Sequence, residues 1–318
     1  MPIRVVSFGG RAGFYLRVLF PGFAWKAYYK LQTFLRKKKT SQYINRCLSV
    51  PFPIIMQIET MNRCNGKCSF CPANGKDETR PFKLMDDKLF EKILNELEAL
   101  NYSGVLTLHI NNEPFLDKRM PEMLKEARKR LPDAKILMQT NGTTLTPDKL
   151  NAISNSVDFL LVNNYNNSYR LTESSKMIYE HVKNNHEIFK NINITIERRY
   201  ANEVLSNRAG ESPNYPHSEN VIHDPCILPF TDFTIFPDGV IGICCNDVRE
   251  KTNFGNLNNQ SIFDLLHDKK MIDLKNAVAQ DRSNYSFCKN CDFIDAGVRL
   301  NSIFNRQFNH HPRLLEGS

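Results

Sequence analysis

Residues 58–72 read IETMNRCNGKCSFCP, and the three cysteines in this stretch decide the fold. Cys64, Cys68 and Cys71 are separated by three and then two residues, directly after an apolar run at 54–59 that has the length of a strand. Three thiolates on one loop can bind three irons of a four-iron cluster and leave the fourth iron open. A structural zinc site needs four ligands, and no fourth cysteine or histidine lies nearby in the sequence. The spacing therefore favours an iron–sulfur cluster.

Strand-like and helical stretches alternate from residue 54 onward. The later apolar runs are at 105–110, 135–140, 157–163 and 192–198, with helical stretches between the five runs at 86–100, 118–130, 146–154 and 173–189. Such alternation predicts parallel βαβ units with right-handed crossovers. Five strands fall short of the eight in a closed barrel. The sequence therefore predicts an α/β fold, built as a partial (β/α) barrel of parallel strands.

The cysteine loop resembles the signature of the radical S-adenosylmethionine (SAM) superfamily. Phe70 stands where that family usually has an aromatic residue before its last cysteine. The resemblance implies a 4Fe–4S cluster on Cys64, Cys68 and Cys71, whose open iron binds the amino and carboxylate groups of SAM. It also implies reductive cleavage of SAM to a 5′-deoxyadenosyl radical, with a flavodoxin or ferredoxin as the electron donor.

Polar residues follow each later strand, at the edge where parallel barrels build their sites. The segment Asn-Asn-Glu-Pro around Glu113 looks like a variant of the family's Gly-Gly-Glu-Pro segment, which implies that Glu113 binds the SAM amino group. Asn141 belongs to a Thr-Asn-Gly element similar to the family's, beside the SAM, and Asn163 follows with an amide able to bind ribose hydroxyls. Arg198, or its neighbour Arg199, is expected to pair with the SAM carboxylate.

Five more cysteines lie in the C-terminal part. Cys226, Cys244, Cys288 and Cys291 resemble the auxiliary-cluster domain of radical SAM enzymes in its shortened form, the twitch version of the SPASM domain. The resemblance implies a second 4Fe–4S cluster on these four residues. A hairpin of strands at 231–236 and 240–244 and a helix at 262–279 are expected around it. A closed zinc site on the same four cysteines is the alternative.

Cys245 directly follows Cys244, so side-chain alternation along a strand turns it to the other face. A free cysteine is most often a small buried apolar residue. The functional interpretation is that Cys245 donates a hydrogen atom to a substrate radical, which would make the enzyme an epimerase.

The chain has 318 residues, enough for one large domain and a smaller one. We expect an N-terminal amphipathic helical extension at 1–50, the radical SAM barrel at 51–200, a linker at 201–225, the auxiliary-cluster domain at 226–295 and a tail at 296–318. No apolar run is long enough to span a bilayer, and the first residues lack the apolar core of a signal peptide. These features, together with clustered cysteines, predict a cytoplasmic protein.

The formal net charge is +8, and we interpret the basic run at 36–39 as a solvated helix end. Contact of the N-terminal segment with a membrane surface is a weaker interpretation, and no nucleic-acid-binding module is recognisable. Family members with the shortened domain act on aminocyclitols and aminoglycosides. The expected function is therefore oxidation or epimerisation of a sugar- or cyclitol-like small molecule, in glycan or secondary-metabolite biosynthesis. Two alternatives are radical modification of a ribosomal peptide and a zinc-stabilised protein without enzymatic activity.

Overall fold

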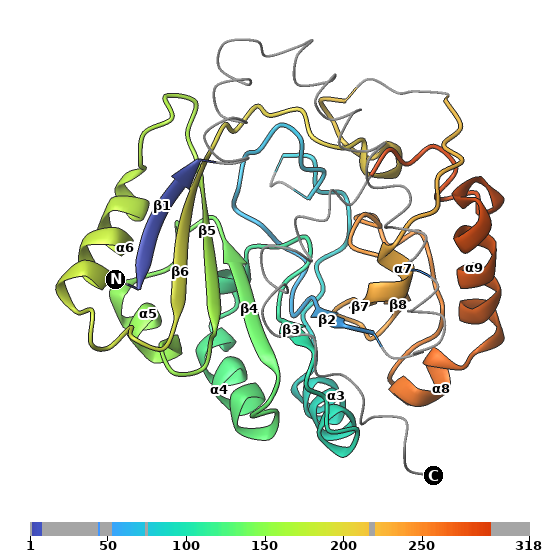
Figure 1. Ribbon diagram of the computed structural model, residues 1–318, viewed down its shortest axis with the longest axis horizontal. Coiled ribbons are helices and arrows are strands. Elements are labelled where there is room, and N and C mark those ends of the chain that lie inside the picture. Colours follow the sequence, from blue (N-terminus) through green and yellow to red (C-terminus); the bar gives the residue numbers. More distant parts are fainter. Residues whose placement is uncertain (1, 8–43, 45–52, 74–75, 216–219, 294–318) are drawn as a thin grey trace.

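The computed structural model describes residues 2–7, 44, 53–73, 76–215 and 220–293. Its centre is an eight-stranded sheet in the order β1-β6-β5-β4-β3-β2-β7-β8 (Figure 1). The strands are β1 (Ile3–Ser7), β2 (Ile55–Ile58), β3 (Val105–Thr107), β4 (Lys135–Thr140), β5 (Phe159–Tyr165), β6 (Asn193–Arg199), β7 (Asp232–Ile235) and β8 (Ile241–Gly242). Every neighbouring pair from β1 to β7 is parallel, and β8 pairs antiparallel with β7. The predicted partial barrel of parallel strands is confirmed.

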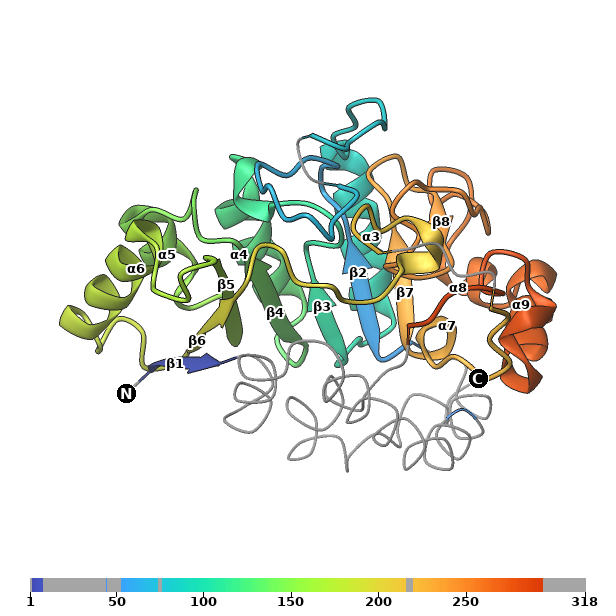
Figure 2. The same cartoon turned by 90° about the horizontal axis from the view of Figure 1, so that it is seen from above.

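Helices cover one face of the sheet along β3 to β6, and further helices lie at its β7–β8 end (Figures 1 and 2). The covering helices are α3 (Asp87–Ala99), α4 (Met120–Arg130), α5 (Pro147–Ile153) and α6 (Glu173–Asn184). At the far end from β1 lie α7 (Leu228–Thr231), α8 (Ile262–Leu266) and α9 (Lys269–Gln280); the 3₁₀ turns are Pro114–Leu116, Arg208–Gly210 and Arg282–Asn284. None of the helices in the described ranges is long and apolar enough to cross a membrane.

The first of these helices illustrates how the sequence specifies them. The Asp86 side chain accepts a hydrogen bond from the Lys88 backbone N–H and so caps the amino end of α3. Buried leucines, isoleucine and phenylalanine recur at intervals of one, three and four residues along one side: Leu89, Phe90, Ile93, Leu94 and Leu97. This stripe packs against the sheet and makes the helix part of the main core.

Side chains on the strands alternate between the helix-covered face and the barrel interior. Met56 and Ile58 of β2 belong to the main core under the helices. Ile55 instead packs with Val105 and Leu137 in a separate small cluster, which closes the interior near the amino ends of the strands. Closer to the carboxyl ends of the strands, the positions that face the barrel interior are polar. A binding site can therefore form at the carboxyl edge of the sheet.

The structure differs from the sequence prediction at several elements. The predicted helix at 262–279 is two helices, because Asp268 accepts a hydrogen bond from the Lys270 N–H and starts α9 anew after α8. Helix α6 ends at Asn184 rather than at 189. The predicted hairpin is present, but its first strand, β7, also pairs in parallel with β2 and so extends the barrel sheet.

The N-terminal extension was predicted to be helical, and most of residues 1–50 lie outside the described residues. The described start forms β1 instead, which pairs in parallel with β6 from Ile3 to Ser7. The predicted tail at 296–318 also lies outside the described residues.

Candidate active site

The loop carrying Cys64, Cys68 and Cys71 follows β2 at the carboxyl edge of the sheet. Cys68 is buried and the other two are partly buried. The backbone N–H of Gly66 donates to Cys64 Sγ at 3.3 Å. Burial raises the pKa of Cys64 and of Cys68 to about 12. Both thiols would therefore be deprotonated at neutral pH only with the help of a cation such as iron.

The structure places Glu113 and Asn141 beside this loop. The Glu113 side chain is 1% exposed, and its oxygens accept hydrogen bonds from Thr140 Oγ1 at 2.6 Å and from the Asn141 backbone N–H at 2.7 Å. Burial raises the pKa of Glu113, while these bonds oppose the rise. The Asn141 Nδ2 donates to Asn65 Oδ1 at 2.8 Å, within the cysteine loop. Glu113 thus joins the ends of β3 and β4 to the loop, and its predicted contact with SAM stays a prediction.

The two arginines at the end of β6 lie in different surroundings. The Arg198 guanidinium lies 5.3 Å from the centre of the Tyr169 ring. Arg199 instead pairs with Glu203 at 2.8 Å and lies over the rings of Phe70 and Tyr165. Its positive charge also acts to lower the pKa of Cys68. Of the two, it is therefore Arg199 whose charge acts on the cysteine loop.

Asn163 lies on β5 beside Glu197 of β6 in the sheet register. The Asn163 side chain is buried, and its Oδ1 has no hydrogen-bond partner among the described residues. A buried acceptor without a donor costs free energy unless a ligand supplies one. This observation is compatible with the predicted contact to SAM and does not test it.

The second group of cysteines gathers beyond β7. Cys226, Cys244, Cys288 and Cys291 are each at most 9% exposed. Burial raises the pKa of all four thiols, and the charges of Cys226 and Cys291 raise the pKa of other members of the group further. Within the described ranges, no set of three or more His, Cys, Asp or Glu side chains has the arrangement of a single-ion site.

Arg282 holds the segments of this second group together, a role the sequence did not reveal. The side chain is 2% exposed and donates to the carbonyl oxygens of Asp224, Pro225, Cys291 and Phe293, at 2.5–3.0 Å. These four carbonyls flank Cys226 and Cys291. No motif marks this arginine, since its partners lie up to 58 residues away in the chain.

Asn111, four residues after the end of β3, links the segments that carry the two groups of cysteines. Its backbone N–H donates to Glu59 Oε1 at 3.1 Å, directly after strand β2 and before the first cysteine loop. Its Nδ2 donates to the carbonyl oxygen of Cys245 at 3.1 Å, the residue after Cys244. Cys245 itself is partly buried. Asn111 therefore joins the end of β2 to the segment that follows Cys244.

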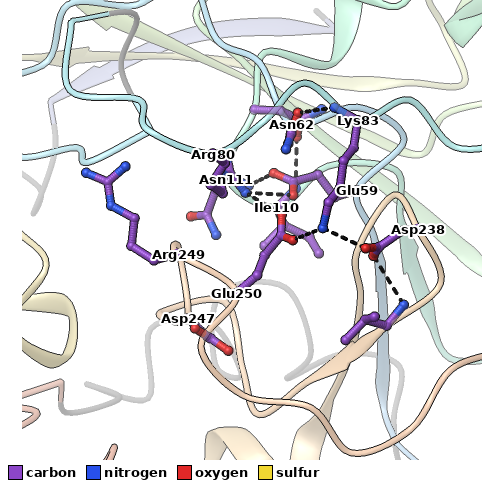
Figure 3. A network of polar contacts seen from close by, with 12 residues as sticks. Glu59, Asn62, Arg80, Lys83, Ile110, Asn111, Asp238, Asp247, Arg249 and Glu250 are labelled. Carbon is purple, nitrogen blue, oxygen red and sulfur yellow. Dashed lines mark hydrogen bonds and ion pairs between the residues drawn. The ribbon is translucent and has the colours of Figure 1, made fainter.

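A buried charged cluster lies at the same junction (Figure 3). Arg80 Nη1 contacts Glu59 Oε2 and Glu250 Oε1, each at 3.2 Å. Arg80 Nη2 also contacts Glu78 Oε2 at 2.8 Å. The four side chains are between 0% and 9% exposed. Burial raises the pKa of Glu59 to about 7, although the charge of Arg80 opposes the rise.

Lys83 continues this cluster toward the C-terminal part. Its ammonium pairs with Asp238 at 2.6 Å, and also with Glu250 (Figure 3). Asp238 belongs to the β7–β8 turn and Glu250 to the segment after Cys245. The segment that follows the first cysteine loop is therefore bound to the C-terminal domain by ion pairs from both Arg80 and Lys83.

Comparison with known proteins agrees with this arrangement. The radical SAM superfamily matches residues 58–199, and SPASM, an iron–sulfur cluster-binding domain, matches residues 226–292. The first range contains the loop of Cys64, Cys68 and Cys71. The second contains the four buried cysteines, and an iron–sulfur domain there favours a cluster over the zinc alternative.

Two curated relatives carry enzyme names. The chain is 22% identical over 240 residues to the S-adenosyl-L-methionine-dependent 2-deoxy-scyllo-inosamine dehydrogenase of Niallia circulans. The matched segment covers 75% of this chain and 92% of that protein. It is 32% identical over 103 residues to the S-adenosylmethionine-dependent nucleotide dehydratase of Psychrobacter lutiphocae, covering 29% of this chain and 34% of that one.

Among solved structures, the crystal structure of BtrN in complex with AdoMet and 2-DOIA has a TM-score of 0.64 at 22% identity, covering 76% of this chain and 94% of BtrN. BtrN in an open conformation has a TM-score of 0.57 at 19% identity, with the same coverage of both chains. At these identities the likeness establishes the fold.

Proposed function

The chain belongs to the radical SAM superfamily and carries a C-terminal SPASM-type iron–sulfur domain, and we propose that it oxidises a hydroxyl-bearing carbon of a sugar- or cyclitol-like small molecule. The observation that carries the proposal is Asn111, which hydrogen-bonds both to Glu59, five residues before Cys64, and to Cys245, the residue after Cys244. A substrate held beside Asn111 would lie between a source of radicals and an acceptor of electrons.

The residues fit two clusters of different kinds. We assign the SAM-binding cluster to Cys64, Cys68 and Cys71, which leave one iron open for SAM. The auxiliary cluster is assigned to the four buried cysteines of the C-terminal domain: Cys226, Cys244, Cys288 and Cys291. When bound, SAM and its cluster would supply a radical that removes one hydrogen atom from a substrate carbon. The auxiliary cluster would accept the electron that remains after the hydroxyl group of that carbon has lost its proton.

The protein's own groups orient SAM and exclude water. Glu113 and Asn141 fix the ends of β3 and β4 against the cysteine loop, and the buried Asn163 Oδ1 is available to a ribose hydroxyl. Arg199, partly buried over the Phe70 ring, keeps a positive charge beside Cys68. A flavodoxin- or ferredoxin-type protein is the proposed electron donor.

The substrate class is supported by the dehydrogenase relative, whose name identifies a cyclitol-type substrate and whose length the chain covers to 92%. Epimerisation is the second candidate, because Cys245 is partly buried and its carbonyl is bonded to the same Asn111. A thiol there can return a hydrogen atom to the substrate radical.

Mass analysis of the product after turnover in deuterated water separates these outcomes. Oxidation removes two hydrogens and lowers the product mass by about two units, whereas epimerisation introduces one solvent deuterium at carbon. A product with neither change would reject both.

A further inference from the structure

Arg208 extends from the linker into the junction between the two groups of cysteines. The linker follows β6 and crosses the sheet toward β7 (Figure 2). Arg208 Nη1 donates to Asn111 Oδ1 at 2.9 Å. Asn111 in turn donates to Cys245 O, so the guanidinium is linked through Asn111 to the segment that contains Cys244 and Cys245.

The backbone around Arg208 is built to hold it there. Arg208 and Ala209 both have positive φ angles, of 48° and 57°, although neither is glycine. Such strained conformations persist only where the surroundings impose them, and they are concentrated at functional sites. Here the preceding residue imposes them: Asn207 donates from its backbone N–H to Asp292 Oδ1 at 2.7 Å and from its side-chain Nδ2 to Asn290 O at 2.6 Å.

The same turn touches the auxiliary-cluster segment directly. Burial raises the pKa of Cys291, and hydrogen bonds from the backbone N–H groups of Phe293 and Ala209 oppose that rise. The backbone on either side of Arg208 is therefore fixed to the Cys288–Cys291 segment, and its side chain is bound to Asn111, beyond the end of β3.

Arg208 also differs from the other cations of this region. Arg80, Lys83, Arg199 and Arg249 each pair with at least one carboxylate. Across the part of the chain that the structure describes, no carboxylate lies within ion-pair distance of Arg208, and Asn111 is its hydrogen-bond partner. A guanidinium has five N–H donors in a planar fork that fits carboxylates and phosphates.

We propose that Arg208 binds an anionic group of the substrate, a phosphate or a carboxylate carried by a sugar or cyclitol. This inference rests on the proposed function and narrows its substrate class. The anion would bind on the auxiliary-cluster side of the junction, because the turn carrying Arg208 is fixed to the Cys288–Cys291 segment rather than to the first cysteine loop.

The test is isothermal titration of the anaerobic, SAM-loaded holoenzyme with four probes: glucose 1-phosphate, glucuronate, neutral glucose and cationic glucosamine. We expect one of the two anionic probes to bind, and which one identifies phosphate or carboxylate as the group recognised. Arg208→Gln should weaken that binding about 10- to 100-fold, the value of one charged hydrogen bond. Arg208→Lys should weaken it less, since the charge remains. Arg170→Gln, at an exposed arginine between β5 and α6, is the matched control and should bind like the wild type.

Three results would overturn the inference: neither anionic probe binds, Arg208→Gln binds the anion as the wild type does, or Arg208→Gln weakens SAM binding instead. The last would assign Arg208 to the SAM carboxylate. Failure of the proposed function looks different, because a wild-type enzyme that forms no 5′-deoxyadenosine from SAM under dithionite rejects that function whatever the titrations give. Equal iron content in all variants verifies that each is folded.

Discussion

Replacing Glu59 by glutamine is expected to change how the stability of the protein depends on pH. Burial raises the pKa of Glu59 from its usual 4.5 to about 7. The native protein therefore retains a proton that the unfolded chain releases as the pH rises from 4.5 to 7. The folded state binds more protons in this window, so its stability falls as the pH rises. A pKa difference of this size corresponds to about 3 kcal/mol, at about 1.4 kcal/mol per factor of ten.

Glutamine does not titrate, so the Glu59→Gln variant lacks this loss of stability. The assay is the melting temperature Tm of anaerobic holoenzyme at pH 5, 6, 7 and 8. The Tm of Glu59→Gln minus that of wild type should rise from pH 5 to pH 8 by roughly 6 °C, at about 2 °C per kcal/mol. Arg80 keeps two other carboxylate partners in the variant, Glu78 and Glu250, and is not left as an unpaired buried charge.

Glu78→Gln is the control, with the same substitution in the same cluster. Burial acts to raise the pKa of Glu78, but hydrogen bonds from Arg80 outweigh it and the pKa is lowered. Its titration therefore lies below pH 5, and Glu78→Gln should lower Tm by the same amount at every pH tested. A Tm difference for Glu59→Gln that stays constant from pH 5 to pH 8 would show that the pKa of Glu59 is not raised in the folded protein.

Three further substitutions test other parts of the structure. Glu113→Gln should weaken SAM binding about tenfold in calorimetry, because Thr140 and Asn141 lose a charged acceptor; unchanged affinity would argue against its role. Arg282→Met should reduce the iron content from about eight to about four per chain, since the four carbonyls around Cys226 and Cys291 lose their common donor; full iron content would contradict this. Gly239→Ala should cost about 1–2 kcal/mol in stability, because φ is +82° and the new Cβ would lie 2.9 Å from Asn256 Oδ1; an unchanged Tm would show that the turn relaxes.

Local patterns explain which parts of the fold could be predicted. The cysteine spacing and the strand–helix alternation are local signals, and the Pro-Asp-Gly turn before β8 needs only three residues, with Gly239 at a positive φ. Strand β1 could not be predicted in this way. Its partner β6 lies 191 positions away at Arg4 and Thr195, and the five residues of β1 carry no signal for that edge of the sheet.

The candidate site likewise contains residues that local motifs mark and residues whose roles depend on distant parts of the chain. Cys64 and Glu113 stand in recognisable segments, whereas Arg80 depends on Glu250, 170 positions later in the chain. The role of Arg282 could not be predicted either, because its partners are backbone carbonyl oxygens, which residues of any type can supply. The break between α8 and α9 was missed for a different reason: apolar spacing continues across it, and only the cap at Asp268 marks the new start.

We assign two four-iron clusters to separate groups of cysteines. The iron and sulfide content of anaerobically reconstituted protein tests this assignment, with wild type beside a Cys64/Cys68/Cys71→Ala triple variant. We predict about eight irons in the wild type and about four in the variant. About four irons in the wild type, none in the variant and one zinc retained in both would mean that the C-terminal cysteines bind zinc and no second cluster.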